Sequence, residues 1–386
     1  MFRILGVLLV ISMPLILQAK QKICLNMIVK NESAVIKRCL DSVKPVIDYW
    51  VIVDTGSTDE TKKIIKKELK NIPGELYERP WKNFGESRSE AFNLARGKGD
   101  YILFMDADDV LEFEKEVQIP FLTQDLYSMW RGTKDFQYLK PQIARGNLPW
   151  KWVGVTHEYL DCDVPFTSSI LQEVKYVSKD GGASSCDPQK FIKNVKLLEE
   201  GIKKEPNNHR YAFYLAESLR DAGDKPKALH WFQKRVDMGG WAEEVYWSLL
   251  QIGHMLSDLG LAPNIVIEAY KNAHAYRPHR AEAVYYLAEA YNHNDQFLLA
   301  YECIKQWERL PKPNEKDYLF NIQWIETFGL LFQISICSYY AGHYQEALEA
   351  CDRLLTMDDL PESWHERTVG NREFPLTKLQ TLLSQK

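Results

Sequence analysis

The first half of the chain alternates short apolar runs with helical patterns, and this alternation is the feature that most constrains the fold. The apolar runs have the length and residue types of buried strands, and they cover residues 22–29, 49–53, 75–78 and 101–105. Helical spacing fills the intervals, at residues 33–43, 60–69 and 84–96. Strands that alternate with helices predict a fold of the α/β class, with a mostly parallel sheet between two helical layers.

Acidic residues directly follow two of these runs. Asp54 comes after the second run, and Asp106 and Asp108 come after the fourth. In sheets of this kind, ligands bind beyond the carboxyl ends of the strands. Carboxylates two residues apart can face one hard divalent cation, which neutralises a nucleoside diphosphate as it leaves. An acidic turn after a strand is common by itself, so the evidence for a metal site is that two such clusters lie on one rim. We therefore expect an Mn²⁺ or Mg²⁺ site here.

Three segments around these acids, taken as a set, resemble glycosyltransferase family 2, whose members have the GT-A fold. They are MIVKNE at 27–32, VDTGSTD at 53–59 and DAD at 106–108. The helix before the fourth strand also resembles that family, through Trp81, Phe84, Arg88 and Ala91. The resemblance covers roughly residues 22–160, and the order and separation of the segments fit the family.

The resemblance implies an inverting transferase with a divalent metal cofactor and a nucleotide-sugar donor, which we expect to be UDP-linked. Glu32 and Asp54 would bind the nucleoside, and Asp106 and Asp108 would hold the metal and the diphosphate. The donor-binding set as a whole would be Glu32, Asp54, Arg88, Asp106 and Ala107. One residue departs from the pattern: Ser89 stands where relatives carry Asn, and a hydroxyl cannot copy both functions of an amide.

A further motif, WKWVGVTHEY at 150–159, resembles the Trp-and-HE stretch of the lipopolysaccharide-core and repeat-bearing branch of the same family. His157 is a candidate third metal ligand beside Asp106 and Asp108. Glu158 is a candidate general base for the acceptor hydroxyl, and Asp161 is the next candidate, with Asp163. The alternative is that the His–Glu pair only satisfies local hydrogen bonds. A zinc protease is excluded on this motif, because Asp161 stands where the second His of HExxH would be.

Beyond Gly182 the pattern becomes helical, and residue types recur at fixed offsets. Ala216, Gly223, Ala228 and Phe232 are matched by Ser335, Gly342, Ala347 and Cys351, and in part by Ala288, Ala300 and Ile304. A degenerate copy is expected at 253–273. The series resembles the tetratricopeptide (TPR) repeat, whose units stack into an all-α superhelix. Such a domain could serve as a buttress or a dimer surface, or its groove could bind a peptide or protein.

Near the start of the chain, residues 4–17 contain no charged residue and follow the basic residue Arg3. This pattern predicts a signal peptide and an exported or secreted protein; the alternatives are a membrane anchor and a cytoplasmic chain. We expect a leader at 1–20, a GT-A domain at 21–180 and a TPR-like domain at 187–386.

The seven cysteines lack metal-ligand spacing, and Cys162 and Cys186 either form a disulfide or stay as free thiols.

Composition narrows the function classes. The formal net charge of -5 argues against nucleic acid as a partner. The expected partners are a nucleotide sugar and a glycan, lipid-linked or protein acceptor. A competing class is a TPR adaptor whose nucleotide-binding domain is only weakly active. A nucleotidyltransferase is a third class, but the chain lacks a phosphate-binding loop rich in Gly, Arg and Lys.

Overall fold

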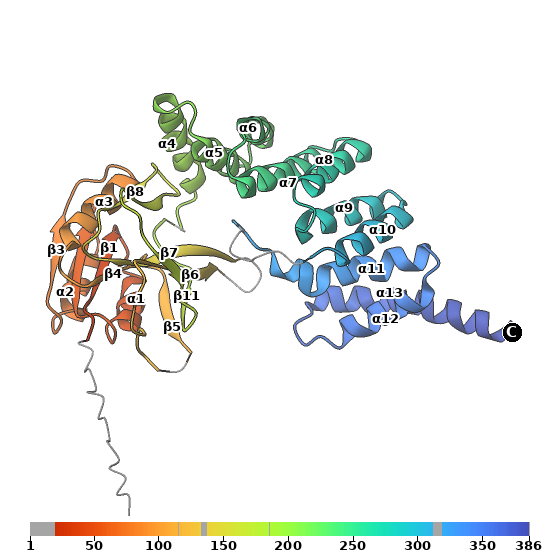
Figure 1. Cartoon of the computed structure of the whole chain (residues 1–386), viewed down its shortest axis with the longest axis horizontal. Helices are drawn as coiled ribbons and strands as arrows, with labels where there is room; N and C mark the ends of the chain where they lie inside the picture. Colours follow the sequence, from red (N-terminus) through yellow and green to blue (C-terminus); the bar gives the residue numbers. More distant parts are fainter. Residues whose placement is uncertain (1–19, 115, 133–136, 185, 312–318, 386) are drawn as a thin grey trace, which may run out of the picture.

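The computed structural model of the 386-residue chain describes residues 20–114, 116–132, 137–184, 186–311 and 319–385. It contains an N-terminal α/β domain and a C-terminal arc of helices (Figure 1). The predicted leader at 1–20 lies outside the described residues except for Lys20, so it stays a prediction. No helix in the described part of the chain is long and apolar enough to cross a membrane.

The four predicted strands form one half of the main sheet. Their observed bounds are β1 (Ile23–Val29), β2 (Tyr49–Asp54), β3 (Gly74–Glu78) and β4 (Tyr101–Phe104). They lie side by side in the order β3-β2-β1-β4 and are all parallel, as the alternating pattern predicts. Parallel pairing brings their carboxyl ends to one edge of the sheet.

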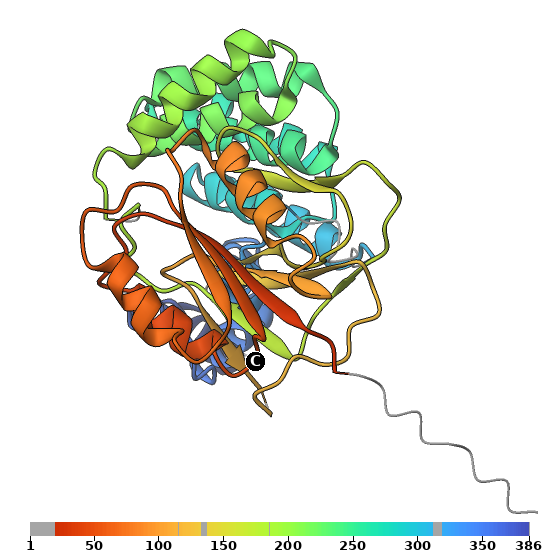
Figure 2. The same ribbon diagram turned by 90° about the vertical axis from the view of Figure 1, so that its left-hand side faces the viewer.

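Helices cover both faces of this sheet (Figure 2). The helices are α1 (Ile36–Val43), α2 (Thr61–Glu68) and α3 (Phe84–Ala95). Alternate residues of β1 point to opposite faces: Leu25 packs in a core with α1 and α2, while Cys24 packs in another core with α3. Both faces are therefore buried, which explains the continuous apolar runs in the sequence.

The other half of the sheet mixes parallel and antiparallel pairs, so the sheet is mixed, but most of its described strand pairs are parallel, as predicted. The later strands are β5 (Val110–Phe113), β6 (Leu126–Gly132), β7 (Gln137–Arg145), β10 (Ser168–Ile170) and β11 (Val174–Val177). The sheet continues as β4-β7-β6-β11-β5, and β7 is antiparallel to both β4 and β6. The strands β8 (Trp150–Val153) and β9 (Tyr159–Cys162) form a separate antiparallel hairpin. The HE motif lies in the loop between them, directly before β9. In the described residues no helix lies between β6 and β7, so these consecutive strands can pair antiparallel.

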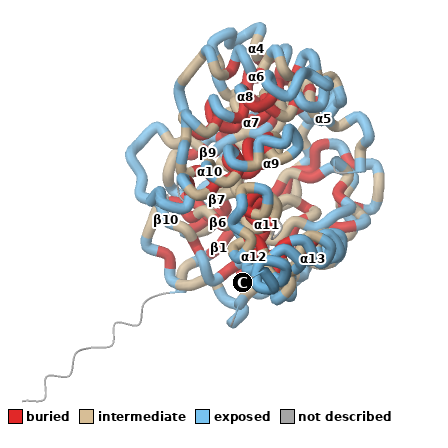
Figure 3. Tube along the Cα trace, turned by 90° about the vertical axis from the view of Figure 1, so that its right-hand side faces the viewer, coloured by how far each residue is buried: buried red, intermediate tan, exposed pale blue. Residues whose placement is uncertain are grey.

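The C-terminal domain consists of helices that pack in sequence order. They are α4 (Lys190–Lys204), α5 (His209–Asp221), α6 (Lys225–Met238), α7 (Ala242–Asp258), α8 (Pro263–Tyr276), α9 (Ala281–His293), α10 (Phe297–Glu308), the π-helical turn η2 (Ile325–Gly329), α11 (Leu330–Tyr340), α12 (Tyr344–Leu355) and α13 (Glu362–Ser384). Figure 3 shows buried segments inside the stack and mostly exposed segments on the last helix, α13.

The recurring residues occupy the positions expected for helical repeats. Ala216, Ala228 and Phe232 are fully buried between α5 and α6, and Ala347 and Cys351 are buried in α12. Gly223 and Gly342 form the turns between paired helices, with φ values of +86° and +89°. Glycine adopts this left-handed conformation without a steric cost, which explains its recurrence. The degenerate copy corresponds to the pair α7 and α8.

All seven cysteines are free thiols in this structure. The disulfide considered between Cys162 and Cys186 is therefore not formed. Cys24, Cys39, Cys337 and Cys351 are buried and pack as small apolar side chains.

Candidate active site

The predicted donor residues gather at the carboxyl edge of the parallel strands. Asp54 is the last residue of β2 and pairs in register with Val29 at the end of β1. Glu32 follows β1, and its carbonyl accepts hydrogen bonds from Val35 N and Ile36 N as α1 begins. Asp106 follows β4, which pairs with β1 on the other side. The edge predicted from the strand ends is therefore present.

Asp54 is held rigidly by the turn that follows it. One carboxylate oxygen, Oδ1, accepts hydrogen bonds from Gly56 N at 2.9 Å and Ser57 N at 2.8 Å. The other oxygen, Oδ2, is buried and has no hydrogen-bond partner in the structure. A buried acceptor without a partner is costly to a fold. Asp54 therefore has one oxygen fixed by the turn and one buried oxygen that no described group pairs with.

Asp106 is the centre of a group of cations, which we call the Asp106 cluster (Asp106 with Arg88, Arg131 and Lys140). Its Oδ1 accepts from Arg88 Nη2 at 2.5 Å, and its Oδ2 accepts from Arg131 Nη1 at 3.1 Å and Lys140 Nζ at 2.7 Å. Burial by itself would raise the pKa of the Asp106 carboxyl, but the cations Arg88, Lys140 and Arg131 outweigh burial and hold this pKa well below its usual range. Asp106 is therefore ionised and fully paired.

Arg88 joins the Asp106 cluster to the HE motif. Its Nε lies 2.6 Å from Oε1 of Glu158, whose side chain is 9% exposed. The sequence places these three residues 18 and 52 positions apart, and the fold brings them into one contact chain. Glu158 thus reaches the same rim as the donor residues, which is where a base for the acceptor would act.

Ser89 fixes the helix that carries Arg88. Its hydroxyl accepts from Trp152 N at 2.9 Å and lies 3.2 Å from Trp152 O, so it exchanges hydrogen bonds with β8. At the start of α3, a Cβ added to Gly85 would lie 2.3 Å from Gly154 O, so only glycine allows this close approach. Ser89 therefore docks α3 on the hairpin, which gives the departure from the family pattern a structural role.

The segment after β11 packs over Glu32 and Asp108. Ala183 N donates to Glu32 Oε2 at 3.2 Å, and a Cβ added to Gly182 would lie 2.3 Å from Asp108 Oδ2. Arg38 Nη2 donates to the carbonyl of Asp108 at 2.9 Å. Burial, and then the charges of Asp108 and Asp106, raise the pKa of Glu32 to about 7. A donor bound here would lie beside this segment.

The predicted metal ligands are not assembled as one set. In the described ranges, no three His, Cys, Asp or Glu side chains form a group that could hold a metal ion. The Asp106 carboxylate is engaged by cations, and the His157 ring stacks on Tyr214 with centroids 4.1 Å apart. Asp108 lies close enough to Glu32 for its negative charge to raise the pKa of Glu32. Ala107 is buried between Asp106 and Asp108.

Asp161 and Asp163, the alternative bases, belong to the β8–β9 hairpin. Asp161 lies 3.7 Å from Lys151 Nζ, and Asp163 lies 2.5 Å from it. Both contacts are on exposed side chains. The described contacts of these two residues do not include the Asp106 cluster.

Three residues of this site were missed from the sequence: Arg131 on β6, Lys140 on β7 and Tyr176 on β11. Tyr176 Oη accepts from Asp106 N at 3.2 Å, and its ring lies 5.3 Å from the Arg131 guanidinium. Asp109 is fully buried and pairs with Arg131 at 2.7 Å. The sequence did show Arg131 and Lys140 as two cations in strand-like stretches after the DAD motif. Whether they face Asp106 depends on the register of the antiparallel pairing of their strands, which the sequence does not reveal.

The fold is an α/β domain with acidic residues at the carboxyl ends of its parallel strands, followed by a helical-repeat domain. Residues 24–134 match the model of glycosyl transferase family 2, and residues 195–239 match a tetratricopeptide repeat model. An uncharacterized glycosyltransferase of Rickettsia felis is 33% identical over 231 residues, which cover 57% of this chain and 77% of the relative. The chain belongs to glycosyltransferase family 2.

A second relative and one solved structure complete the comparison. The glycosyltransferase SunS of Bacillus subtilis is 24% identical over 233 residues. The match covers 55% of this chain and 52% of SunS, so the chain spans about half the length of that relative. The TPR protein YrrB matches 48% of this chain and 85% of its own, with 13% identity and a TM-score of 0.38.

Proposed function

We propose that the protein is a metal-dependent, inverting glycosyltransferase that moves a sugar from a nucleotide sugar to an acceptor hydroxyl. The observation that carries this proposal is the contact chain Asp106–Arg88–Glu158 at the edge where Asp54 presents its unpartnered oxygen. It links the donor side of the rim to a carboxylate on the acceptor side. Family membership supports the reaction class.

Asp54 and Glu32 would bind the nucleoside. Asp54 Oδ2 is a fixed, desolvated acceptor, which suits an N–H or O–H donor such as a nucleobase imide or a ribose hydroxyl. Glu32 follows the neighbouring strand β1 and would contact the same part of the donor. A uracil base has the imide that this acceptor needs, which supports a UDP-linked donor.

Charge balance at the Asp106 cluster supports a requirement for a divalent cation. The three cations Arg88, Arg131 and Lys140 pair with the three carboxylates Asp106, Asp109 and Glu158, so the pairing leaves no surplus positive charge. A leaving nucleoside diphosphate would therefore need further neutralisation. A bound Mn²⁺ or Mg²⁺ would supply it, and Asp108 is the residue that would hold the ion.

Glu158 would act as the general base. The acceptor oxygen forms a bond to the anomeric carbon while the bond from that carbon to the diphosphate oxygen breaks. The proton of the acceptor hydroxyl goes to the Glu158 carboxylate, and the electron pair leaves with the nucleoside diphosphate. Arg88 would hold Glu158 in place, because it contacts both Glu158 and Asp106.

The acceptor would be a glycan, a lipid-linked sugar or a protein, and the repeat domain could hold a peptide or protein beside the rim. An N-terminal signal peptide would place the reaction outside the cytosol. Both statements remain proposals that rest on the sequence pattern.

The test is a transfer assay with the full chain, manganese and a panel of nucleotide sugars, read first as slow hydrolysis of the donor. Glu158→Gln should lower the rate of transfer by about 10²–10⁴-fold with little change in donor KM, because a base acts in the transition state. Asp161→Asn is the matched control and should keep the rate of the unmodified protein. Excess chelator should abolish activity, and manganese should restore it.

The opposite results would contradict distinct parts of the proposal. Full activity in excess chelator would rule out the metal requirement. Loss of transfer in Asp161→Asn, with normal transfer in Glu158→Gln, would show that the base assignment is wrong. If no nucleotide sugar is hydrolysed or transferred, the chain is better explained as a repeat-based adaptor.

A further inference from the structure

Helix α5 of the repeat domain contacts the HE motif of the catalytic domain through one side chain, Arg210. Its Nε and Nη2 both donate to the carbonyl oxygen of His157, at 2.9 Å and 2.7 Å. Two charge-assisted hydrogen bonds from one guanidinium fix both the position and the orientation of that carbonyl. In Figure 1, α5 lies next to the end of the catalytic domain that carries β8.

The residues on either side of Glu158 are both held by this helix. The His157 ring stacks on Tyr214 of α5, with centroids 4.1 Å apart and planes within 4°. On the other side, the Arg210 guanidinium lies over the Tyr159 ring at 5.1 Å, and over the Tyr214 ring at 4.8 Å. Cation–π and stacking contacts of this kind stabilise one arrangement of the aromatic groups.

His157 has a backbone conformation that needs such support. Its φ is +50°, in the left-handed region that non-glycine residues seldom occupy. Strained conformations of this kind persist where surrounding contacts determine them. This conformation determines where the next residue, Glu158, directs its carboxylate, which lies 2.6 Å from Arg88 Nε. The contacts of α5 therefore act on the one backbone segment that orients Glu158.

Arg210 is itself held by a carboxylate of the repeat domain. Its Nη1 lies 3.6 Å from Oε1 of Glu244 at the start of α7. The other oxygen of Glu244 accepts from Arg235 Nη2 at 2.9 Å and Nε at 3.1 Å, and the Arg235 side chain is fully buried. A buried, two-point pair between α6 and α7 gives Arg210 a fixed neighbour.

We propose that Arg210 is a positioning residue for catalysis: it holds His157 in its left-handed conformation and so aims the Glu158 carboxylate. This inference rests on the proposed function, in which Glu158 is the base. It makes the repeat domain a necessary part of the catalytic geometry. The DAD and HE motifs by themselves would then not be sufficient for full turnover.

The first experiment compares Arg210→Ala with Arg220→Ala in the full chain. Arg220 is a matched control, because it lies on the same helix, its side chain is 25% exposed against 23% for Arg210, and it pairs only within the repeat domain in the described contacts. Arg210→Ala should lower kcat roughly 10–100-fold with donor KM within about twofold, because a small misplacement of a catalytic group costs that much. Arg220→Ala should keep kcat, and Arg210→Lys should recover part of it.

The second experiment tests whether Arg210 acts through Glu158. If it does, the double variant Glu158→Gln/Arg210→Ala should be no slower than Glu158→Gln alone, because the two changes remove the same contribution. Multiplied losses in the double variant would overturn the proposal, and so would a normal kcat in Arg210→Ala. Failure of the proposed function is distinguishable: Glu158→Gln would then keep normal transfer, or no variant would transfer sugar.

A third measurement does not depend on activity. Hydrogen exchange of the amides at residues 156–160 should become at least about tenfold faster in Arg210→Ala, because the segment loses its contacts with α5. Arg220→Ala should leave that exchange unchanged. Equal exchange in Arg210→Ala and the unmodified protein would show that Arg210 does not hold the segment, whatever reaction the protein catalyses.

Discussion

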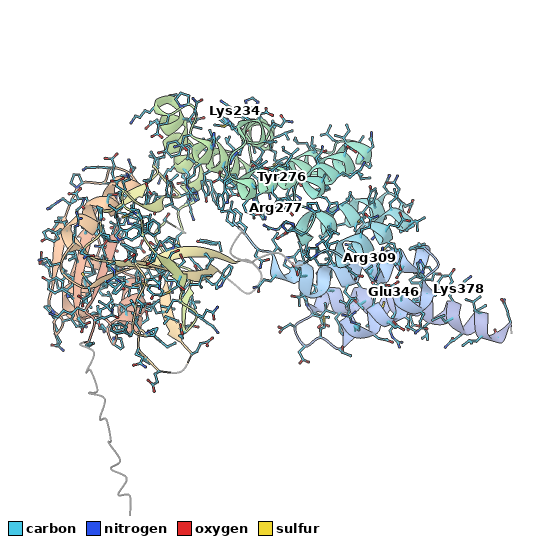
Figure 4. The ribbon with its side chains drawn as sticks, in the orientation of Figure 1. Lys234, Tyr276, Arg277, Arg309, Glu346 and Lys378 are labelled. Carbon is cyan, nitrogen blue, oxygen red and sulfur yellow. The ribbon has the colours of Figure 1, made fainter. Side chains whose placement is uncertain are left out.

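Each domain buries a network of arginines and carboxylates, but the two networks differ in what they face. In the catalytic domain, the Asp106 cluster lies at the carboxyl end of parallel strands, beside the unpartnered oxygen of Asp54. In the repeat domain, the Arg280 cluster (Arg280 with Glu243, Glu282 and Arg277) lies between helices. Arg277, labelled at the end of α8 in Figure 4, lies 3.1 Å from Glu243.

Backbone groups of another segment of the chain also bind the Arg280 cluster. Arg280 Nη2 donates to Phe320 O at 2.7 Å, and Leu319 N donates to Glu243 Oε2 at 3.1 Å. These bonds attach the segment before η2 to α7 and α9. The comparison shows that a buried ion network does not by itself indicate an active site. The location of the Asp106 cluster at the strand ends is the feature that does.

The largest expected effect is that of Asp106→Ala. It should abolish transfer and lower the free energy of unfolding by about 3–5 kcal/mol, because three cations would be left without their shared partner. Activity assays together with denaturant unfolding would measure both losses. Asp163→Ala, which removes an exposed carboxylate of the same domain, is the control and should change neither. A fully stable Asp106→Ala protein would show that the cluster contributes little to folding.

Arg280→Ala should have a comparable effect on stability and none on the chemistry. Removing the arginine leaves Glu243 and Glu282 buried without their main partner, which typically costs about 3–5 kcal/mol. Chemical denaturation would detect this loss. At a temperature where the variant is folded, kcat should equal that of the unmodified protein. A large fall in kcat for folded Arg280→Ala would remove the distinction between the two clusters.

Glu32→Gln should change how stability depends on pH. The folded pKa of Glu32 is raised from 4.5 to about 7, so the folded state binds more protons than the unfolded state between these values. Stability should therefore fall as pH rises from about 4.5 to about 7. In Glu32→Gln this part of the fall, on the order of 1–2 kcal/mol after allowance for partial exposure, should disappear. Unfolding curves at pH 5 and pH 8 would measure it, and an unchanged difference would contradict the assignment.

The smallest expected effect is that of Arg372→Ala. Arg372 of α13 pairs with Asp352 of α12 at 2.5 Å, but their side chains are 32% and 49% exposed. Exposed pairs contribute at most about 1 kcal/mol. The variant should therefore unfold within that margin of the unmodified protein and keep full activity. Together with Arg280→Ala, it measures what burial adds to an ion pair in the repeat domain.

Much of the catalytic half could be predicted because its signals are local. Four apolar runs predicted four strands, and parallel pairing placed Asp54, Asp106 and Glu32 on one edge. The repeat offsets predicted buried small residues and glycine turns, because close helix packing and left-handed turns each require particular residue types. The metal set stays a prediction, since whether His157 joins Asp106 and Asp108 depends on a backbone conformation that spacing does not reveal.

The sequence by itself determined the domain order, the parallel core and the acidic rim, since each follows from periodicity or from a motif at a strand end. Only the tertiary structure decided that Arg131 and Lys140 surround Asp106, and that Arg88 joins it to Glu158. It also decided that Arg210 of the repeat domain donates a hydrogen bond to His157 of the HE motif. Such contacts depend on antiparallel register and domain docking, which bring together residues far apart in the chain, and no local pattern encodes which side chains will meet.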